Sequence, residues 1–506
     1  MVAGLFHSGG RAAEPSLLPL ALFLFALAVA AGQSDELAFK SQRAKEMMAA
    51  GRFEEAIPIY QQLVQAVPGN PGLRLNLALA QHMAGRDRDA IPNLEAVLKI
   101  QPGLAPALVT LGAARLAANQ TQLAVAPLQK AVAADPKDQE ARGMLADALA
   151  ALKRYDEAAE HYRELSGISP NDPRAWYGLG TCYESIAASA YERLQKTSPQ
   201  SPYVAALIAD NRVQRRQYAS AFALYNDALK QLPNLHGIHA ALAGIYRQTG
   251  RADWAAAEDA KERDLPAPDC KAHRSECEFT GGHDLQAATL PRGSAPLPEA
   301  LFWQIKAANE LALQAFFRLT QLPPSVELHQ FRAETARNQN QHLEATKEWR
   351  AALELSPGNL RLKQELAVSL FMAQDYRAAL DESTGLLKAK PQSPELNFVA
   401  GDSCLRLEEP EKAVAYLEAA LAADPKLVAA EASLGLALLR LGKNAEAVPH
   451  LEKSLKIDDD GSLHYQLARA YQAAGSSEKA RTIMAQYQEI LKKVEESRKE
   501  RIGPPQ

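Results

Sequence analysis

Small and large apolar residues recur along the chain at fixed offsets. In several segments an Ala or Gly is followed twelve residues later by an Ala, and a large apolar residue stands four positions beyond that. The small pairs are Ala44 and Ala56, Ala78 and Ala90, Gly112 and Ala124, Ala146 and Ala158, Gly401 and Ala413, and Gly435 and Ala447. The large residues are Tyr60, Leu94, Leu128, Tyr162, Leu417 and Leu451. Helix axes approach to about 8–10 Å only where the contact residues are small. The pattern therefore predicts close-packed pairs of helices.

Prolines mark the ends of these pairs at a constant interval of 34 residues. They are Pro68, Pro102, Pro136 and Pro170, then Pro199 and Pro233, then Pro323, Pro357, Pro391 and Pro425, with Asp459 at the next interval. Proline inside a helix removes a hydrogen bond and clashes with the preceding turn, so each one closes a helix. A Gly or polar residue stands 17 positions earlier, at Gly51, Gly85, Asn119 and Gly442. Each unit is therefore predicted to be a hairpin of two helices of about 12–14 residues.

The segments "AAGRFEEAIPIYQQLVQAVPGN" and "ALLRLGKNAEAVPHLEKSLKIDDD" resemble tetratricopeptide repeats in the order of their Gly/Ala, aromatic or Leu, and Pro positions. The resemblance covers roughly residues 37–487 apart from one insertion. It implies an all-α fold, a right-handed α-solenoid whose first helices line a concave groove. Four prolines depart from the pattern because they lie inside second helices, where we expect shortening or kinks: Pro58, Pro92, Pro127 and Pro449.

The interval fails once, because Pro170 and Pro199 are only 29 residues apart. The segment between them contains no helix breaker after Gly180, which predicts one long helix from about Arg174 to Lys196 or a hairpin with a very tight turn. A near-copy, "PEALFWQIKAANELALQAFFRLTQLPP", occurs later. The expected organisation is a first array at 37–265 with an irregular unit at 173–199, a linker at 266–298, a second array at 299–487 with an irregular unit at 299–323, and a capping helix and tail at 488–506.

The N-terminus has the pattern of an export signal. Arg11 precedes an apolar run from Leu17 to Ala31, which contains the small-residue site Ala28-Val29-Ala30. The run is shorter than the ~20 residues that span a bilayer. We expect residues 1–32 to be a signal peptide cleaved after Ala30, with an uncleaved anchor at residues 17–31 as the alternative. Either way the protein is expected outside the cytoplasm, in the periplasm or secreted.

The linker is the one stretch where Pro, Gly and Ser gather, and it carries two of the four cysteines. Cys270 and Cys277 are expected to form a disulfide, since neighbouring cysteines pair in an oxidising compartment. The alternative is a zinc site made by these two thiolates with His273 and His283, although this spacing matches no common zinc finger. The other two cysteines, Cys182 and Cys404, lie on apolar helix faces and are expected to be buried.

Composition argues against several classes of function. A net charge of -4 over 506 residues gives no electrostatic footprint for nucleic acid. The sequence contains no H-E-x-x-H, phosphate-loop or G-x-S-x-G motif. The linker of about 33 residues is too short for a catalytic domain, which usually takes 100 or more. We therefore expect no enzyme activity, no cofactor and no resident metal. The histidines His82, His161, His450 and His464 are expected on surface or groove faces without carboxylate partners at a recognisable spacing.

The resemblance implies that partner proteins bind along the concave groove. Groove positions recur at the second, fifth, ninth and twelfth residues of each unit, and in the C-terminal array they give Phe398, Asp402, Tyr465, Arg469 and Gln472. The expected function is a non-catalytic scaffold outside the cytoplasm, within an envelope, secretion or polysaccharide-export assembly. The alternatives are a groove that binds a glycan or small molecule, and a zinc-containing linker site or an activity hidden in the linker. The membrane is expected to be a partner only through an uncleaved N-terminal segment.

Overall fold

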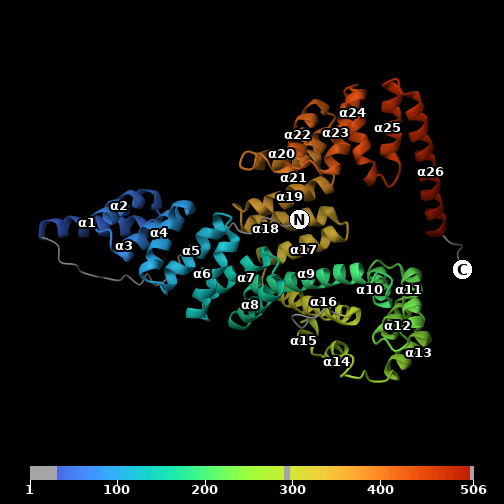
Figure 1. Cartoon of the computed structure of the whole chain (residues 1–506), viewed down its shortest axis with the longest axis horizontal. Coiled ribbons are helices and arrows are strands. Elements are labelled where there is room, and N and C mark those ends of the chain that lie inside the picture. The colour runs from blue at the N-terminus through green and yellow to red at the C-terminus, as the bar shows by residue number, and fades with distance from the viewer. Residues whose placement is uncertain (1–30, 290–296, 502–506) are drawn as a thin grey trace. The chain divides into compact units, whose positions relative to one another are not determined.

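The structure is a computed structural model that describes residues 31–289 and 297–501. Every regular element within these ranges is a helix, and none of the described residues forms a strand (Figure 1). The expected all-α fold is confirmed. The export signal expected in residues 1–32 lies almost entirely outside the described residues. No described helix combines the length and the apolar character that a bilayer crossing requires.

The described residues divide into two compact units, one that ends at Pro323 and one that starts at Pro324. The helices of the first unit are α1 (Ala31–Ala49), α2 (Phe53–Ala66), α3 (Pro71–Met83), α4 (Asp87–Ile100), α5 (Ala105–Ala117), α6 (Thr121–Ala134), α7 (Gln139–Ala151), α8 (Tyr155–Ile168), α9 (Pro173–Thr197), α10 (Pro202–Gln214), α11 (Tyr218–Gln231), α12 (Ile238–Gln248), α13 (Ala252–Arg263), α14 (Arg274–Thr280), α15 (Asp284–Ala288) and α16 (Pro298–Thr320).

The second unit continues the same alternation of first and second helices. Its elements are α17 (Val326–Asn338), α18 (His342–Leu355), α19 (Leu360–Met372), α20 (Tyr376–Leu387), α21 (Pro394–Arg406), α22 (Pro410–Ala423), α23 (Val428–Arg440), α24 (Asn444–Ser454), the short 3₁₀ helix η1 (Leu455–Ile457), α25 (Ser462–Ala473) and α26 (Ser477–Arg501).

Local chemistry explains where the helices begin and turn. A polar residue two positions after a repeat proline caps most first helices; Asn70, for example, accepts hydrogen bonds from the amides of Gly72 and Leu73. The turns between paired helices adopt left-handed backbone angles, with φ of 72° at Gly51 and 60° at Asn119. In this conformation the residue after the turn donates back to the last helical turn and satisfies its free carbonyls.

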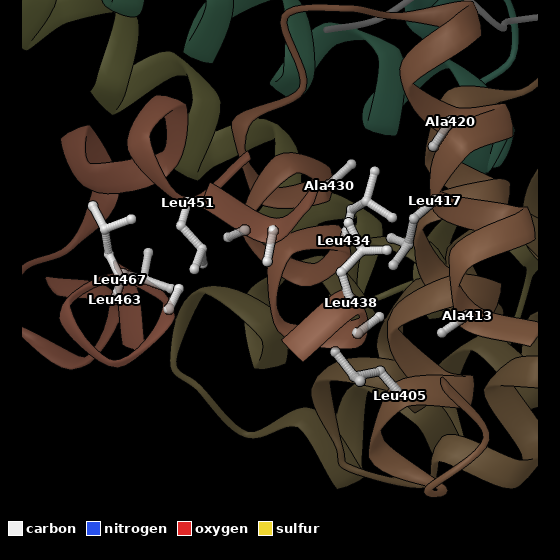
Figure 2. Packing of buried hydrophobic residues seen from close by; sticks show 14 of the residues in the cluster. Leu405, Ala413, Leu417, Ala420, Ala430, Leu434, Leu438, Leu451, Leu463 and Leu467 are labelled. Atoms are coloured by element: carbon white, nitrogen blue, oxygen red, sulfur yellow. The ribbon is translucent and has the colours of Figure 1, made fainter. Parts of the chain in front are cut away.

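The small residues lie where the helices of a hairpin touch. Figure 2 shows this packing in the second unit, where Leu417, Leu434 and Leu451 come from successive helices and meet at one apolar layer. A Cβ built at Gly435 would lie 2.7 Å from Leu451, closer than carbon atoms normally approach. Each hairpin therefore buries its apolar faces partly within itself and partly on its neighbours, which is what makes a repeat array continuous.

The internal prolines do not shorten most of their helices. The proline-containing helices α2, α4 and α6 each have 14 residues, the same as the proline-free α8. The expectation of shortening is wrong for these three. Pro58 is the sixth residue of α2, so the backbone hydrogen bond that it removes belongs to the second turn, and the remaining turns continue unaffected. Only α24, with Pro449, is shorter, at 11 residues, and it passes directly into η1.

The irregular segment 173–199 forms one continuous helix, α9, of 25 residues, so the first of the two expected alternatives is confirmed. Its near-copy is the 23-residue α16. The two long helices pack against each other in the first unit (Figure 1), with the guanidinium of Arg318 5.6 Å from the ring centre of Trp176. Segment 266–298 contains α14 and α15, which both pack on α16, and the division between the compact units falls after α16 rather than within that segment.

Candidate functional site

A cavity of about 470 Å³ opens between the first helices α21, α23 and α25 of three successive hairpins in the second unit. Its apolar wall is formed by Leu405, Leu436, Leu439 and Ala473. Its polar wall is formed by three arginines with Asn444 and Gln466. Because all three first helices contribute, the cavity crosses the repeats along the face that a tetratricopeptide groove is expected to occupy.

The three arginines of the cavity, Arg406, Arg440 and Arg469, differ in how they are held. Arg406 lies 3.3 Å from the Asp402 carboxylate within α21. Arg440 donates to the Leu405 carbonyl at 2.7 Å, and Arg469 packs over the Tyr465 ring at 5.9 Å. Neither Arg440 nor Arg469 has a carboxylate partner among the described residues. The cavity therefore carries positive charge that the described part of the chain does not neutralise.

Buried polar contacts fix the spacing of the cavity's helices. The hydroxyl of Ser433 in α23 donates to the Asp402 carboxylate in α21 at 2.6 Å, and Asp402 is only 3% exposed. The contact from Arg440 to the Leu405 carbonyl joins the same two helices. A hydrogen bond between buried groups loses little to water, so these contacts hold the register of α21 against α23. The arginines are thus presented from a preorganised surface.

The structure distributes the five expected groove residues among different environments. Arg469 lines the cavity, and Tyr465 beside it is 40% exposed and contacts the Tyr487 ring. Gln472 is exposed outside the lining. Phe398 packs against Phe371 with ring centres 5.9 Å apart, and Asp402 is buried beneath the cavity. Arg406 and Arg440, absent from the expected set, follow directly after the twelfth position of their units, a position that sequence inspection could have included.

The linker cysteines lie close together in the first unit. The sulfur atoms of Cys270 and Cys277 are 2.11 Å apart, at disulfide bonding distance. The two histidines of the alternative zinc set face carboxylates instead: His273 lies 2.8 Å from Glu299 and His283 lies 3.2 Å from Glu278. Cys182 and Cys404 are buried, and burial raises the pKa of the Cys182 thiol to about 12, which leaves it unreactive.

Several histidines have carboxylate partners, contrary to the expectation. His82 lies 2.5 Å from Asp87, His464 lies 2.6 Å from Asp458, and His450 contacts Glu431. The last pair is 19 residues apart, and the same separation joins His239 to Glu258 and His329 to Glu348, each at 2.6 Å. A separation of 19 residues connects the first helix of a hairpin to its second. This spacing is the signal in the sequence that would have found the pairs.

The helix hairpins and the groove define an α-helical repeat protein of the protein-binding class. Two sequence models described as tetratricopeptide repeat match the chain, one at residues 47–114 and 115–182 and the other at residues 365–428 and 398–462. The chain is a tetratricopeptide-repeat protein. Repeats of this family generally bind protein partners, which supports a protein-interaction scaffold.

Solved structures of other repeat proteins are similar to parts of the chain. MamA (residues 41 to the end) from Desulfovibrio magneticus RS-1 is 18% identical, and the match covers 39% of this chain and 94% of that one, with a TM-score of 0.29. A thermophilic TPR protein of Thermus thermophilus is 18% identical over 33% and 91% of the two chains, with a TM-score of 0.28. YrrB, a TPR protein with an unusual peptide-binding site, is 21% identical over 33% and 86%, with a TM-score of 0.29. No curated protein matches the chain in sequence.

Proposed function

We propose that the protein is a non-catalytic scaffold that binds an acidic, leucine-containing segment of a partner protein in the groove across α21, α23 and α25. The observation that carries the proposal is the cavity itself, in which Arg440 and Arg469 lack carboxylate partners among the described residues. An acidic segment supplies the missing carboxylates. A guanidinium that binds a carboxylate through two parallel hydrogen bonds selects that group by geometry as well as by charge.

The apolar wall of the cavity supports a protein segment over a free anion. Leu405 is buried at its base, and Leu436 and Leu439 are partly buried on the adjacent helix. These side chains accept an apolar residue of the partner while the arginines engage flanking carboxylates. Interfaces typically combine such a desolvated apolar centre with a charged rim. The lining residues include no His, Cys or carboxylate that could act as an acid, base or nucleophile, which is the basis for proposing a non-catalytic role.

Binding of labelled peptides to the purified chain tests this function. Fluorescence anisotropy compares a Glu/Leu peptide with a Lys/Leu peptide of equal length. Arg440→Ala and Arg469→Ala are each expected to weaken the acidic peptide by about tenfold or more, since a hydrogen bond to a charged group contributes about 1.5–3 kcal/mol. Arg350→Ala is the matched control, because Arg350 is exposed on the second helix α18. Equal binding of both peptides, or equal losses in all three variants, would show that the groove does not recognise acidic segments.

We propose further that the scaffold works outside the cytoplasm, within an envelope, secretion or polysaccharide-export assembly. The basis is the N-terminal sequence, in which Arg11, the apolar run from Leu17 to Ala31 and the Ala28-Val29-Ala30 site have the order of an export signal. Mass spectrometry of the protein from its native cells tests this proposal. The expected mature N-terminus is Ala31 in an extracytoplasmic fraction, or an intact chain in the membrane fraction. An intact chain in the soluble cytoplasmic fraction would contradict it.

A further inference from the structure

Four side chains with metal-binding chemistry meet in the first unit, beside the cysteine pair. His236 precedes α12, His273 and Glu276 belong to the start of α14, and Glu299 lies in the first turn of α16. Donor atoms of His273, Glu276 and Glu299 all lie within 4.8 Å of one another. His273 is 2.8 Å from Glu299, and His236 is 2.8 Å from Glu276. Residues separated by up to 63 positions in sequence thus converge at one point.

We propose that His273, Glu276 and Glu299 form a binding site for a divalent transition metal, with zinc as the ion the ligand set favours. An imidazole nitrogen and carboxylate oxygens bind Zn²⁺ at about 2.0–2.2 Å, which requires ligand atoms roughly 3.3 Å apart. The imidazole argues against calcium and magnesium, which prefer all-oxygen ligand sets. Three protein ligands leave a fourth tetrahedral position for water or for a partner's side chain.

The burial of the three ligands fits a site that is anchored on one side and open on the other. Glu276 is 8% exposed, whereas the side chain of His273 is 47% exposed. The inner carboxylate is therefore fixed, and the outer imidazole has room to turn from Glu299 onto an ion. His236 contacts the Oε1 atom of Glu276 and leaves the other carboxylate oxygen available. A hydrogen bond of this kind orients a metal ligand and raises its affinity.

The cysteine pair positions the site without competing for the metal. His273 and Glu276 both lie inside the short loop that Cys270 and Cys277 close. The loop limits the movement of these two ligands relative to each other, and sulfur atoms bonded together are not thiolates available to zinc. The same region therefore offers two mutually exclusive zinc chemistries. One is the His–carboxylate site of the oxidised chain, and the other is a thiolate–imidazole site that exists only after reduction.

Isothermal titration of zinc chloride into the oxidised, chelator-treated chain tests the proposal. The expected result is one zinc ion per chain with a dissociation constant of tens of micromolar or tighter. His273→Ala and Glu299→Gln are each expected to weaken binding at least tenfold, and His236→Ala by about tenfold, because a residue that orients a ligand typically contributes a factor of 10–100. His283→Ala is the matched control, since His283 is exposed in the same segment but is paired with Glu278.

A second readout separates loss of the site from loss of the fold. Co²⁺ bound in place of zinc gives visible absorption bands, and circular dichroism reports whether each variant keeps its helices. The proposal holds if Co²⁺ bands disappear in Glu299→Gln while the helical signal is unchanged. It fails if the oxidised chain binds no zinc at about 100 micromolar, if the variants bind as well as the original chain, or if binding appears only after reduction, which would assign the metal to the thiolates.

Discussion

Substitution of two glycines by alanine in the second unit gives a direct test of the hairpin packing. Gly435 lies in α23, where an added Cβ would be 2.7 Å from the Cγ and Cδ2 atoms of Leu451 and 3.3 Å from its backbone nitrogen. Leu451 is fully buried, so it has little room to move away. Gly385 lies inside α20, and an added Cβ there would meet nothing within 4 Å. The two positions therefore share helical backbone but differ in the space beside it.

The expected change in the free energy of unfolding is a balance of two terms. Alanine is favoured over glycine inside a helix by about 1 kcal/mol, and this gain applies at both positions. An extra methyl group in a filled contact costs about 1–3 kcal/mol, and this cost applies only at Gly435. Gly385→Ala is thus expected to stabilise α20 by about 1 kcal/mol. Gly435→Ala is expected to be less favourable than Gly385→Ala by about 1–3 kcal/mol.

Hydrogen exchange followed by mass spectrometry measures this difference locally. A local readout is required because arrays of repeats do not generally unfold in one step. Each 1.4 kcal/mol corresponds to a tenfold change in the population of the open state, so the amides of α23 and α24 are expected to exchange faster relative to the α20 gain by about tenfold. If Gly435→Ala protects α23 as much as Gly385→Ala protects α20, the close contact between the paired helices is not tight and the packing argument is wrong.

Three further changes test other contacts. Asn359→Ala removes the side chain that accepts from the amides of Arg361 and Leu362, and is expected to lower the protection of α19 by about 0.5–2 kcal/mol in hydrogen exchange. Burial raises the pKa of Glu431, but hydrogen bonds from Lys453 and His450 outweigh this and hold it below its ordinary 4.5, so its stabilising contribution is complete above about pH 4.5 and is lost as the pH falls below that value; Glu431→Gln is expected to flatten this acid dependence of α23 exchange. Reduction of the chain is expected to destabilise the loop between Cys270 and Cys277 by about 2 kcal/mol, measured as faster exchange of α14 amides, with Cys270→Ser plus Cys277→Ser insensitive to reductant.

The helix hairpins were predictable because their signals are local. Proline spacing indicates where second helices end, and Gly51 and Asn119 occupy the turns because these residues tolerate a left-handed backbone. The packing of α9 on α16 was not predictable in this way. The repeat period records neighbours along the chain, whereas these two helices are separated by the whole segment from Ser198 to Leu297. Their similar sequences showed a duplication but not that the copies touch.

The groove was only partly predictable from repeat positions. Arg469 lines the cavity as its position indicates, but Asp402 is drawn inward by a hydrogen bond from Ser433, which stands 31 residues later in the next hairpin. Contacts between hairpins depend on the side chains of both partners, so a position rule for a single unit does not contain them. The convergence of Glu276 and Glu299 on His273 has the same origin, because it depends on how α14 packs on α16.

A charge-reversal experiment tests the central functional proposal most directly. Arg440→Glu combined with Arg469→Glu reverses the charge of the cavity wall while leaving the buried contact between Asp402 and Ser433 in place. Anisotropy titrations are run with both proteins against the Glu/Leu and Lys/Leu peptides. The account predicts that preference switches, so that the original chain selects the acidic peptide and the reversed chain selects the basic one. Unchanged preference after charge reversal would contradict the assignment of this groove as the binding site.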